Sequence, residues 1–154
     1  MTRMYVAQNV LSDRDRRDFI KKSIPYLRRK EGHPAEQTHA NLHLEKDFGK
    51  YGQVMHRAAE KAIGQNLKIG LSWVLRTTGR KEDMNWHNHH NIHLFDYSLI
   101  YYMRSFRSGT LFREGFVKAK QNSLLIFPSE IEHTTPSSFF HFDRYTFSMD
   151  FNFI

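Results

Sequence analysis

The first part of the chain places its apolar residues at the spacing of helical turns. A helix is predicted after Ser12, which forms an S-x-x-D capping pattern with Asp15, and Pro25 stops or bends this helix. A second apolar stripe indicates a helix over residues 48–63. The segment 31–46 between them is expected to be a loop or a short extended link.

From Leu67 onward the pattern changes to short apolar runs separated by turn residues. Five segments are typical of strands: "LKIGLSWVLRTT", "DYSLIYYMRS", "GTLFREGFVKA", "NSLLIFP" and "RYTFSMDFNF". No helix separates them, which predicts an antiparallel sandwich or barrel with the two helices packed outside. The fold class is therefore mainly β, in a single domain 1–154 with a helical support region 1–66 and a β core 67–154.

Composition narrows the chemistry that the chain can perform. The 154 residues are 40% hydrophobic and 25% charged, which is typical of a globular protein that can bury a core. The absence of cysteine excludes disulfides, thiolate zinc sites and cysteine nucleophiles. No apolar run is long enough to span a bilayer, and the amino terminus lacks the apolar core of a signal peptide. We expect a soluble, cytoplasmic protein that does not bind a membrane.

The net charge of +7 allows attraction to nucleic acid or to an acidic partner. The densest basic groups lie in residues 13–31 and alternate with acidic residues, as on a solvated helix face. The charge alone therefore identifies no partner, and the oligomeric state stays open as well.

Histidines concentrate in one short segment. The stretch "WHNHHNIH", residues 86–93, holds four of the 10 histidines. On a strand, residues i and i+2 point to one face, so His87 and His89 can bind the same metal ion. His133, which follows the predicted strand "NSLLIFP", is the best candidate for a third ligand. Imidazole donors suit iron, zinc, manganese, nickel or copper.

Other interpretations of these histidines stay open. An H-x-H pair often occurs by chance, and a histidine after a strand is usually a hydrogen-bonded turn residue. His90 or His93 can replace His89 in a shifted register, and Asp96 can supply a carboxylate if the chain loops back.

Arg144 opens the alternating strand "RYTFSMDFNF", eleven residues after His133. Thr146 lies on the same face, and the guanidinium group matches a carboxylate with two parallel hydrogen bonds. Beside a metal site, these two residues suit a small dicarboxylate that also chelates the metal. The alternative is a surface ion pair of Arg144 with Asp143 or Asp150.

The motifs stand in a characteristic order: "WHNHH", then "YSLIYYM", "SGTLF", "NSLLIFPSEIEHTTP" and "RYTFSMDFNF". In this order the segment from about Trp73 to Phe153 resembles the double-stranded β-helix of the iron(II)- and 2-oxoglutarate-dependent oxygenases, especially their prolyl-hydroxylase-like branch. The resemblance covers roughly the last 80 residues. The order and spacing of the motifs are more specific than any one motif.

For the metal, the resemblance implies His87 and His133 as ligands of iron(II). One departure matters, because His89 stands where the family has the aspartate of its H-x-D motif. The site would then hold three imidazoles instead of two imidazoles and a carboxylate. Three-histidine sites are known in related β-helix folds, including cupin-type dioxygenases, so the departure leaves the reaction open.

For the co-substrate 2-oxoglutarate, the resemblance implies Arg144 as the anchor of the far carboxylate, with Thr146 assisting. Tyr101 matches a position where the family often has a tyrosine near the co-substrate. Tyr101 and Tyr102 point to opposite faces of their strand, and the sequence does not show which one faces inward.

The expected function is an iron(II)- and 2-oxoglutarate-dependent oxygenase, a hydroxylase, with its substrate entering between residues 78–96 and 104–110. That substrate is a protein, a nucleic acid or a small molecule. One alternative is a cupin-like three-histidine dioxygenase that uses no 2-oxoglutarate, although the chain lacks the glutamate that many cupins have shortly after H-x-H. The other is a metal-binding or nucleic-acid-binding module without catalysis.

Overall fold

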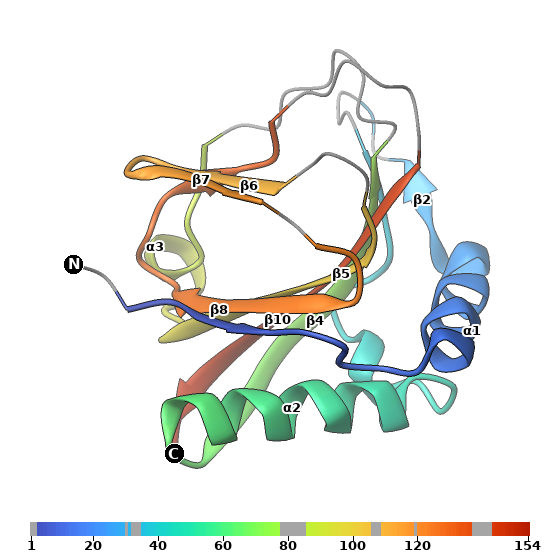
Figure 1. Cartoon of the computed structure of the whole chain (residues 1–154), viewed down its shortest axis with the longest axis horizontal. Coiled ribbons are helices and arrows are strands. Elements are labelled where there is room, and N and C mark those ends of the chain that lie inside the picture. The colour runs from blue at the N-terminus through green and yellow to red at the C-terminus, as the bar shows by residue number, and fades with distance from the viewer. Residues whose placement is uncertain are drawn as a thin grey trace.

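The computed structural model consists of two antiparallel sheets that face each other, with two longer helices against the outer side of the larger sheet (Figure 1). It describes residues 3–29, 31, 35–77, 86–105, 109–118, 120–136 and 143–154. None of the helices in these ranges is both long and apolar enough to cross a membrane.

In the described ranges, the larger sheet has the strand order β1-β8-β5-β10-β4-β3-β2. Its long strands are β4 (Leu67–Thr77), β5 (Tyr97–Arg104), β8 (Ser123–Pro128) and β10 (Arg144–Phe153). Its short edge strands are β1 (Tyr5–Ala7), β2 (Arg28–Arg29) and β3 (Glu36–Gln37). The smaller sheet has the order β7-β6-β9, with β6 (Gly109–Phe112), β7 (Gly115–Lys118) and β9 (His133–Thr134).

The helices are α1 (Asp13–Ser23), α2 (Gly49–Ile63), the single turn α3 (His90–His93), and the 3-10 turns η1 (Ile24–Tyr26) and η2 (Leu42–Leu44). The Ser12 hydroxyl accepts a hydrogen bond from the Asp15 amide at 3.1 Å, as the capping pattern predicts. Gly64 ends α2 with a φ of 79°, in the left-handed region that glycine adopts without steric cost.

The alternation in β10 separates an apolar face from a polar one. The apolar side chains that pack toward the helices are Tyr145, Phe147, Met149 and Phe151. The Phe19 ring of α1 stacks on Tyr51 of α2 at 4.6 Å and meets Phe147 at 5.2 Å. Burying a ring of this size contributes about 1.5–3 kcal/mol, so this face holds the helices in place. The opposite face of β10, which begins with Arg144, points toward the smaller sheet.

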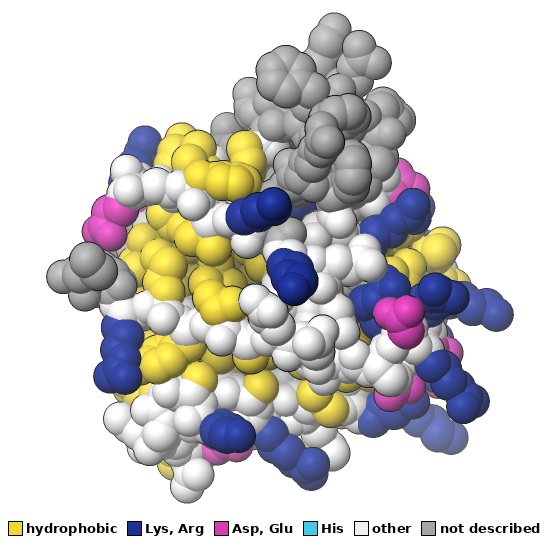
Figure 2. Space-filling view, in the orientation of Figure 1, with side chains coloured by type: hydrophobic (Ala, Val, Ile, Leu, Met, Phe, Trp, Pro, Cys, Tyr) yellow, Lys and Arg dark blue, Asp and Glu magenta, His cyan; other side chains and the backbone are white. Residues whose placement is uncertain are grey.

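The structure confirms the predicted fold class, which is mainly β with two supporting helices. Residues 109–118 form two strands of a hairpin, β6 and β7, and Gly115, where the sequence allows a turn, opens the second strand. Residues 1–66, expected to be helical support, also contribute the edge strands β1, β2 and β3. Figure 2 shows Lys and Arg side chains gathered over α1 with Asp and Glu among them, which agrees with the solvated face expected for residues 13–31.

Candidate metal centre and anion site

Two histidines are paired by the backbone. The His87 amide donates to the His133 carbonyl at 3.1 Å, and the His133 amide donates to the His87 carbonyl at 2.9 Å. This reciprocal pair is one rung of an antiparallel ladder, in which opposed residues lie close together. The two imidazole ring centroids are consequently 4.4 Å apart.

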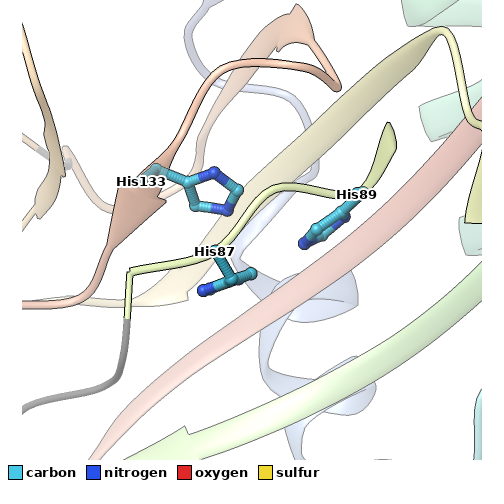
Figure 3. Close-up of side chains that lie close together, drawn as sticks. All are labelled: His87, His89 and His133. Carbon is cyan, nitrogen blue, oxygen red and sulfur yellow. The ribbon is translucent and has the colours of Figure 1, made fainter. Parts of the chain in front are cut away.

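The ring of His89, two residues after His87, lies beside the rings of His87 and His133. Its amide donates to the Ser129 carbonyl at 2.9 Å, which fixes the segment after the bridge. One ring nitrogen from each of His87, His89 and His133 lies within 4.8 Å of the others, and we call these residues the histidine cluster (Figure 3). His87 is exposed, His89 is part-buried and His133 is buried, so the group opens toward solvent on one side.

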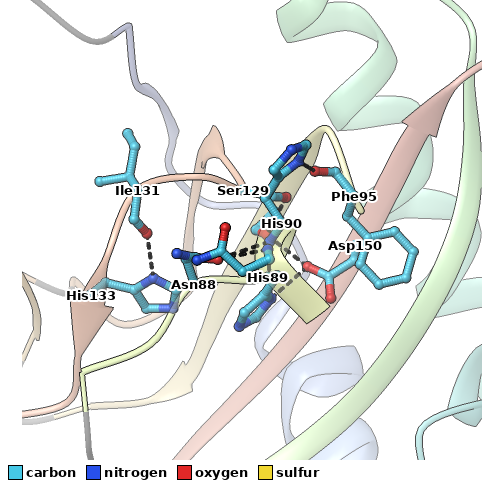
Figure 4. Close-up of polar contacts among 10 residues, drawn as sticks. Asn88, His89, His90, Phe95, Ser129, Ile131, His133 and Asp150 are labelled. Atoms are coloured by element: carbon cyan, nitrogen blue, oxygen red, sulfur yellow. Dashed lines mark hydrogen bonds and ion pairs between the residues drawn. The ribbon is translucent and has the colours of Figure 1, made fainter. Parts of the chain in front are cut away.

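Hydrogen bonds fix the tautomers of two rings in the histidine cluster. The Nδ1 atom of His133 lies 3.1 Å from the Ile131 carbonyl, and Nδ1 of His89 lies 2.8 Å from Oδ1 of Asp150 (Figure 4). Both oxygens accept, so each Nδ1 carries the proton. Each Nε2 then keeps a lone pair, which is the arrangement that metal-binding histidines use.

His133 remains neutral over the physiological pH range. Burial, reinforced by repulsion from His87, lowers its pKa to about 3. A metal ion binds the neutral imidazole, so no proton competes for this ring near neutral pH.

Asp150 and two serines support His89 from behind. Ser129 and Ser98 share a hydrogen bond between their hydroxyls at 2.7 Å, and Ser98 donates to Oδ1 of Asp150 at 2.7 Å. Asp150 is 1% exposed, and in the described part of the chain nothing donates to its other oxygen, Oδ2. A buried carboxylate therefore lies behind the His89 ring, outside the histidine cluster and one ring away from the proposed ligand atom.

Arg144 is a buried cation with neutral partners. Its guanidinium donates to the Gly109 carbonyl at 3.2 Å and lies 3.4 Å from the Thr135 hydroxyl and 5.6 Å from the Tyr102 ring. Burial lowers its pKa. Among the described residues no carboxylate pairs with it, and its Nε has no partner. A buried charge of this kind is costly unless an anion joins it.

The ion pair considered for Arg144 with Asp143 or Asp150 is absent from the described residues, because Asp150 pairs with His89 instead. Thr146 follows on the same face of β10 and is buried. The structure thus places a guanidinium and a hydroxyl on the barrel face that also carries the support of the histidine cluster.

The expectation for Tyr101 requires a correction. Its ring lies 6.4 Å from Phe19 in the helix-side core, and its hydroxyl donates to Asn122 at 2.6 Å. Tyr102 is the tyrosine that faces inward, with its hydroxyl 2.6 Å from that of Thr110 and its ring beside Arg144. Because consecutive side chains of β5 point to opposite faces of the sheet, only one of Tyr101 and Tyr102 can face inward.

The other candidate ligands lie outside the histidine cluster. Nδ1 of His90 bonds to the Phe95 carbonyl at 2.9 Å, and Asp96 accepts from the Phe153 amide at 2.9 Å. His93 is exposed at the end of α3. In the ranges that the structure describes, none of the three belongs to a metal-binding group. Part of the expected substrate mouth, residues 78–85 and 106–108, lies outside the described residues.

No family model and no curated protein matches the sequence. Solved structures match it by fold, at sequence identities of 10–13%. One of them is an oxidoreductase of the 2OG-Fe(II) oxygenase family from Burkholderia pseudomallei. HygX from Streptomyces hygroscopicus, with nickel, 2-oxoglutarate and hygromycin B bound, gives a TM-score of 0.74 at 11% identity, covering 98% of this chain and 83% of its own.

Two further structures agree with this result. The 2-oxoglutarate complex of the viral collagen prolyl hydroxylase vCPH from Paramecium Bursaria Chlorella virus-1 gives a TM-score of 0.70 at 13% identity, covering 98% of this chain and 96% of its own. SnoN, a non-heme α-ketoglutarate-dependent epimerase, gives 0.78 at 11% identity, covering 97% and 77%. At such identities the similarity shows the fold alone, and the fold is the double-stranded β-helix that the resemblance of the motifs implied.

Proposed function

We propose that the chain is an iron(II)- and 2-oxoglutarate-dependent oxygenase that hydroxylates its substrate. The observation that carries the proposal is Arg144, a buried guanidinium without a described carboxylate partner, in the same barrel as the histidine cluster. A buried cation is stabilised by an anion that pairs with it, and a metal ion nearby can bind a chelating ligand. A single small dicarboxylate with a 2-oxo acid at one end satisfies both requirements.

The histidine cluster would hold the metal. Its donors fit iron(II), because two rings already expose Nε2 and the third, His87, lies within 4.8 Å of them. Iron(II), when bound, supplies the redox chemistry and the open positions for a 2-oxo acid and dioxygen. Two proteins of the same fold, HygX and vCPH, have been solved with 2-oxoglutarate bound, and the HygX structures also contain nickel.

The far carboxylate of 2-oxoglutarate would pair with Arg144. Thr146 offers a hydroxyl on the same face, and Tyr102 offers another whose orientation is set by Thr110. The guanidinium can give two parallel hydrogen bonds to a carboxylate, which fixes the direction of the bound molecule as well as its position. In the proposal, Tyr102 therefore takes the role expected for Tyr101.

Aromatic side chains line the buried side of the histidine cluster. The Phe127 ring lies 4.9 Å from His133, the Phe112 ring lies 5.9 Å from it, and the Trp73 ring lies 5.5 Å from His89. These rings lower the local dielectric constant beside the proposed metal ligands, and the Tyr102 ring beside Arg144 does the same for the pairing of Arg144 with an anion. They also restrict the approach of bulk water to the reacting groups.

An anaerobic titration tests this function. Adding 2-oxoglutarate to the iron(II)-loaded protein should produce the weak visible charge-transfer band of a chelated 2-oxo acid. Arg144→Ala should lose most of the response and Arg144→Lys should recover part of it, since lysine lacks the bidentate fork. Arg16→Ala is the matched control, because Arg16 is also buried but donates to the Met103 carbonyl on the helix side.

Each outcome of the titration has one meaning. The band in the wild type and its loss in Arg144→Ala, with iron binding retained, would support the proposal. Iron binding without the band, and without succinate formation once dioxygen is admitted, would overturn it in favour of a three-histidine dioxygenase. A wild-type protein that binds no iron would overturn it in favour of a module without catalysis.

A further inference from the structure

Asp150 has an unusual position for a buried acid. Its Oδ1 lies 2.8 Å from Nδ1 of His89, on the side of the ring away from the Nε2 atom that would bind the metal (Figure 4). Ser98 donates to the same oxygen at 2.7 Å. The side chain is 1% exposed, so water does not solvate its charge.

Within the described residues, Asp150 has no Lys or Arg partner. The only ion-pair partner of its carboxylate there is His89, which carries a charge only if protonated. The second oxygen, Oδ2, is buried without a described partner. A buried carboxylate in this situation requires a positive charge nearby. A metal ion on Nε2 of His89 would supply that charge through the ring.

The histidine cluster lacks a negative charge of its own. Its three neutral imidazoles leave a bound dication uncompensated, whereas the common non-haem iron site has two imidazoles and one carboxylate. If Asp150 is included in the site, one negative charge accompanies the three imidazoles and the dication. The total charge then equals that of the common site, although the carboxylate lies one shell further out.

We infer that Asp150 is a positioning residue that replaces, from behind His89, the carboxylate missing from the metal ligands. The inference rests on the proposed metal site. The Ser129–Ser98–Asp150 chain of hydrogen bonds holds the carboxylate, and Ser129 also accepts from the His89 amide at 2.9 Å. The same group thus fixes the His89 backbone, its ring and the compensating charge.

The variant Asp150→Asn tests the negative charge of Asp150 separately from its hydrogen bond to His89. The amide oxygen still accepts a hydrogen bond from His89, so the ring keeps its orientation while the negative charge is lost. Titration of the metal-free protein with Co²⁺ and Mn²⁺ by calorimetry should show affinity reduced about 10- to 100-fold, the range typical of outer-shell changes. Ser98→Ala, which retains the charge, should lose less affinity than Asp150→Asn.

A second pair of variants tests the exchange directly. In His89→Asp, one oxygen of the new carboxylate takes the place of Nδ1 and faces Oδ1 of Asp150, which lies 2.8 Å from Nδ1 in the wild type. Repulsion should make this variant bind Co²⁺ worse than the wild type, although its ligand set is the common one. Adding Asp150→Asn should recover at least about tenfold in affinity, because the amide can donate to the new carboxylate.

The results separate this inference from the proposed function. Wild-type affinity in Asp150→Asn, or additive losses in the double variant, would overturn the role of Asp150 while leaving the metal site intact. A wild-type protein that binds neither Co²⁺ nor Mn²⁺ would overturn both. Urea unfolding of each metal-free variant and the visible spectrum of bound Co²⁺ identify a change due to misfolding, which would alter the unfolding midpoint as well as the affinity.

Discussion

Replacing Arg144 by methionine should stabilise the ligand-free protein while removing its response to 2-oxoglutarate. The side chain is 3% exposed and bonds to neutral groups among the described residues. Methionine keeps most of the apolar stem and removes a charge that the fold alone does not compensate. Stability and function therefore place opposite demands on this position.

The magnitude follows from two opposing contributions. Replacing buried ionic groups by apolar residues of similar volume often stabilises a protein by about 1–4 kcal/mol. The change also removes the bonds to Gly109 and Thr135, but their lengths of 3.2 and 3.4 Å are long, and together they are worth roughly 1–2 kcal/mol. We expect a net gain of about 1 kcal/mol, or about 2–4 °C in Tm for a chain of this size.

Ligand binding should reverse the order of stabilities. At a concentration one hundred times its Kd, 2-oxoglutarate should raise the unfolding free energy of the Mn²⁺-loaded wild type by about 2.7 kcal/mol. The Arg144→Met variant should gain little. Urea unfolding of both proteins, with and without Mn²⁺ and 2-oxoglutarate, measures all four values. The wild type should be the less stable protein without ligand and the more stable one with it.

Arg16→Met provides the contrast. Arg16 is 7% exposed and donates to the buried Met103 carbonyl at 3.0 Å, with Asp13 as an ionic partner at 3.3 Å. Its loss should destabilise the protein by about 1–3 kcal/mol and leave the gain from 2-oxoglutarate unchanged. If metal-free Arg144→Met were less stable than the wild type by more than about 1 kcal/mol, the guanidinium would be a structural group and the reasoning would be refuted.

Two further predictions concern the ligands and the inward tyrosine. Alanine at any one residue of the histidine cluster should weaken Co²⁺ binding by more than about a hundredfold, which is beyond the range of outer-shell changes. His90→Ala should retain Co²⁺ binding. Calorimetry measures both affinities, and a loss confined to His90→Ala would move the proposed site to His90. Tyr102→Phe should weaken 2-oxoglutarate binding about five- to tenfold through loss of one hydroxyl, while Tyr101→Phe should lower the unfolding free energy by about 1 kcal/mol and leave binding unchanged. The opposite pattern would restore the original expectation for Tyr101.

The strongest periodic signals in the sequence predicted the fold. Strand β10 alternates so clearly that its two faces could be assigned from sequence, and the i, i+2 spacing correctly placed His87 beside His89. Strands β1, β2, β3 and β9 were missed because each has only two or three residues. Strands of this length are determined by distant pairing partners rather than by local pattern.

The sequence misassigned the inward tyrosine and missed the pairing of Asp150 with His89 for different physical reasons. Strand β5 is buried on both faces, so its alternation carries no contrast that could distinguish Tyr101 from Tyr102. Asp150 did give a signal, since it shares the parity of Arg144 and Thr146 along β10. The sequence could place it on the inner face, but its pairing with His89 depends on the turn at Ser129, which no local pattern predicts.

The rung between His87 and His133 has a consequence for how a metal would be chosen. Because backbone hydrogen bonds hold two of the three proposed ligands together, the site does not depend on the metal for its assembly. Ions could then leave and return without unfolding the chain, and chelation would be reversible. A preformed set of nitrogen donors ranks divalent ions by their general affinity order, in which copper, nickel and zinc exceed iron. Occupancy by iron would therefore depend on the supply of ions around the protein more than on selection by the site.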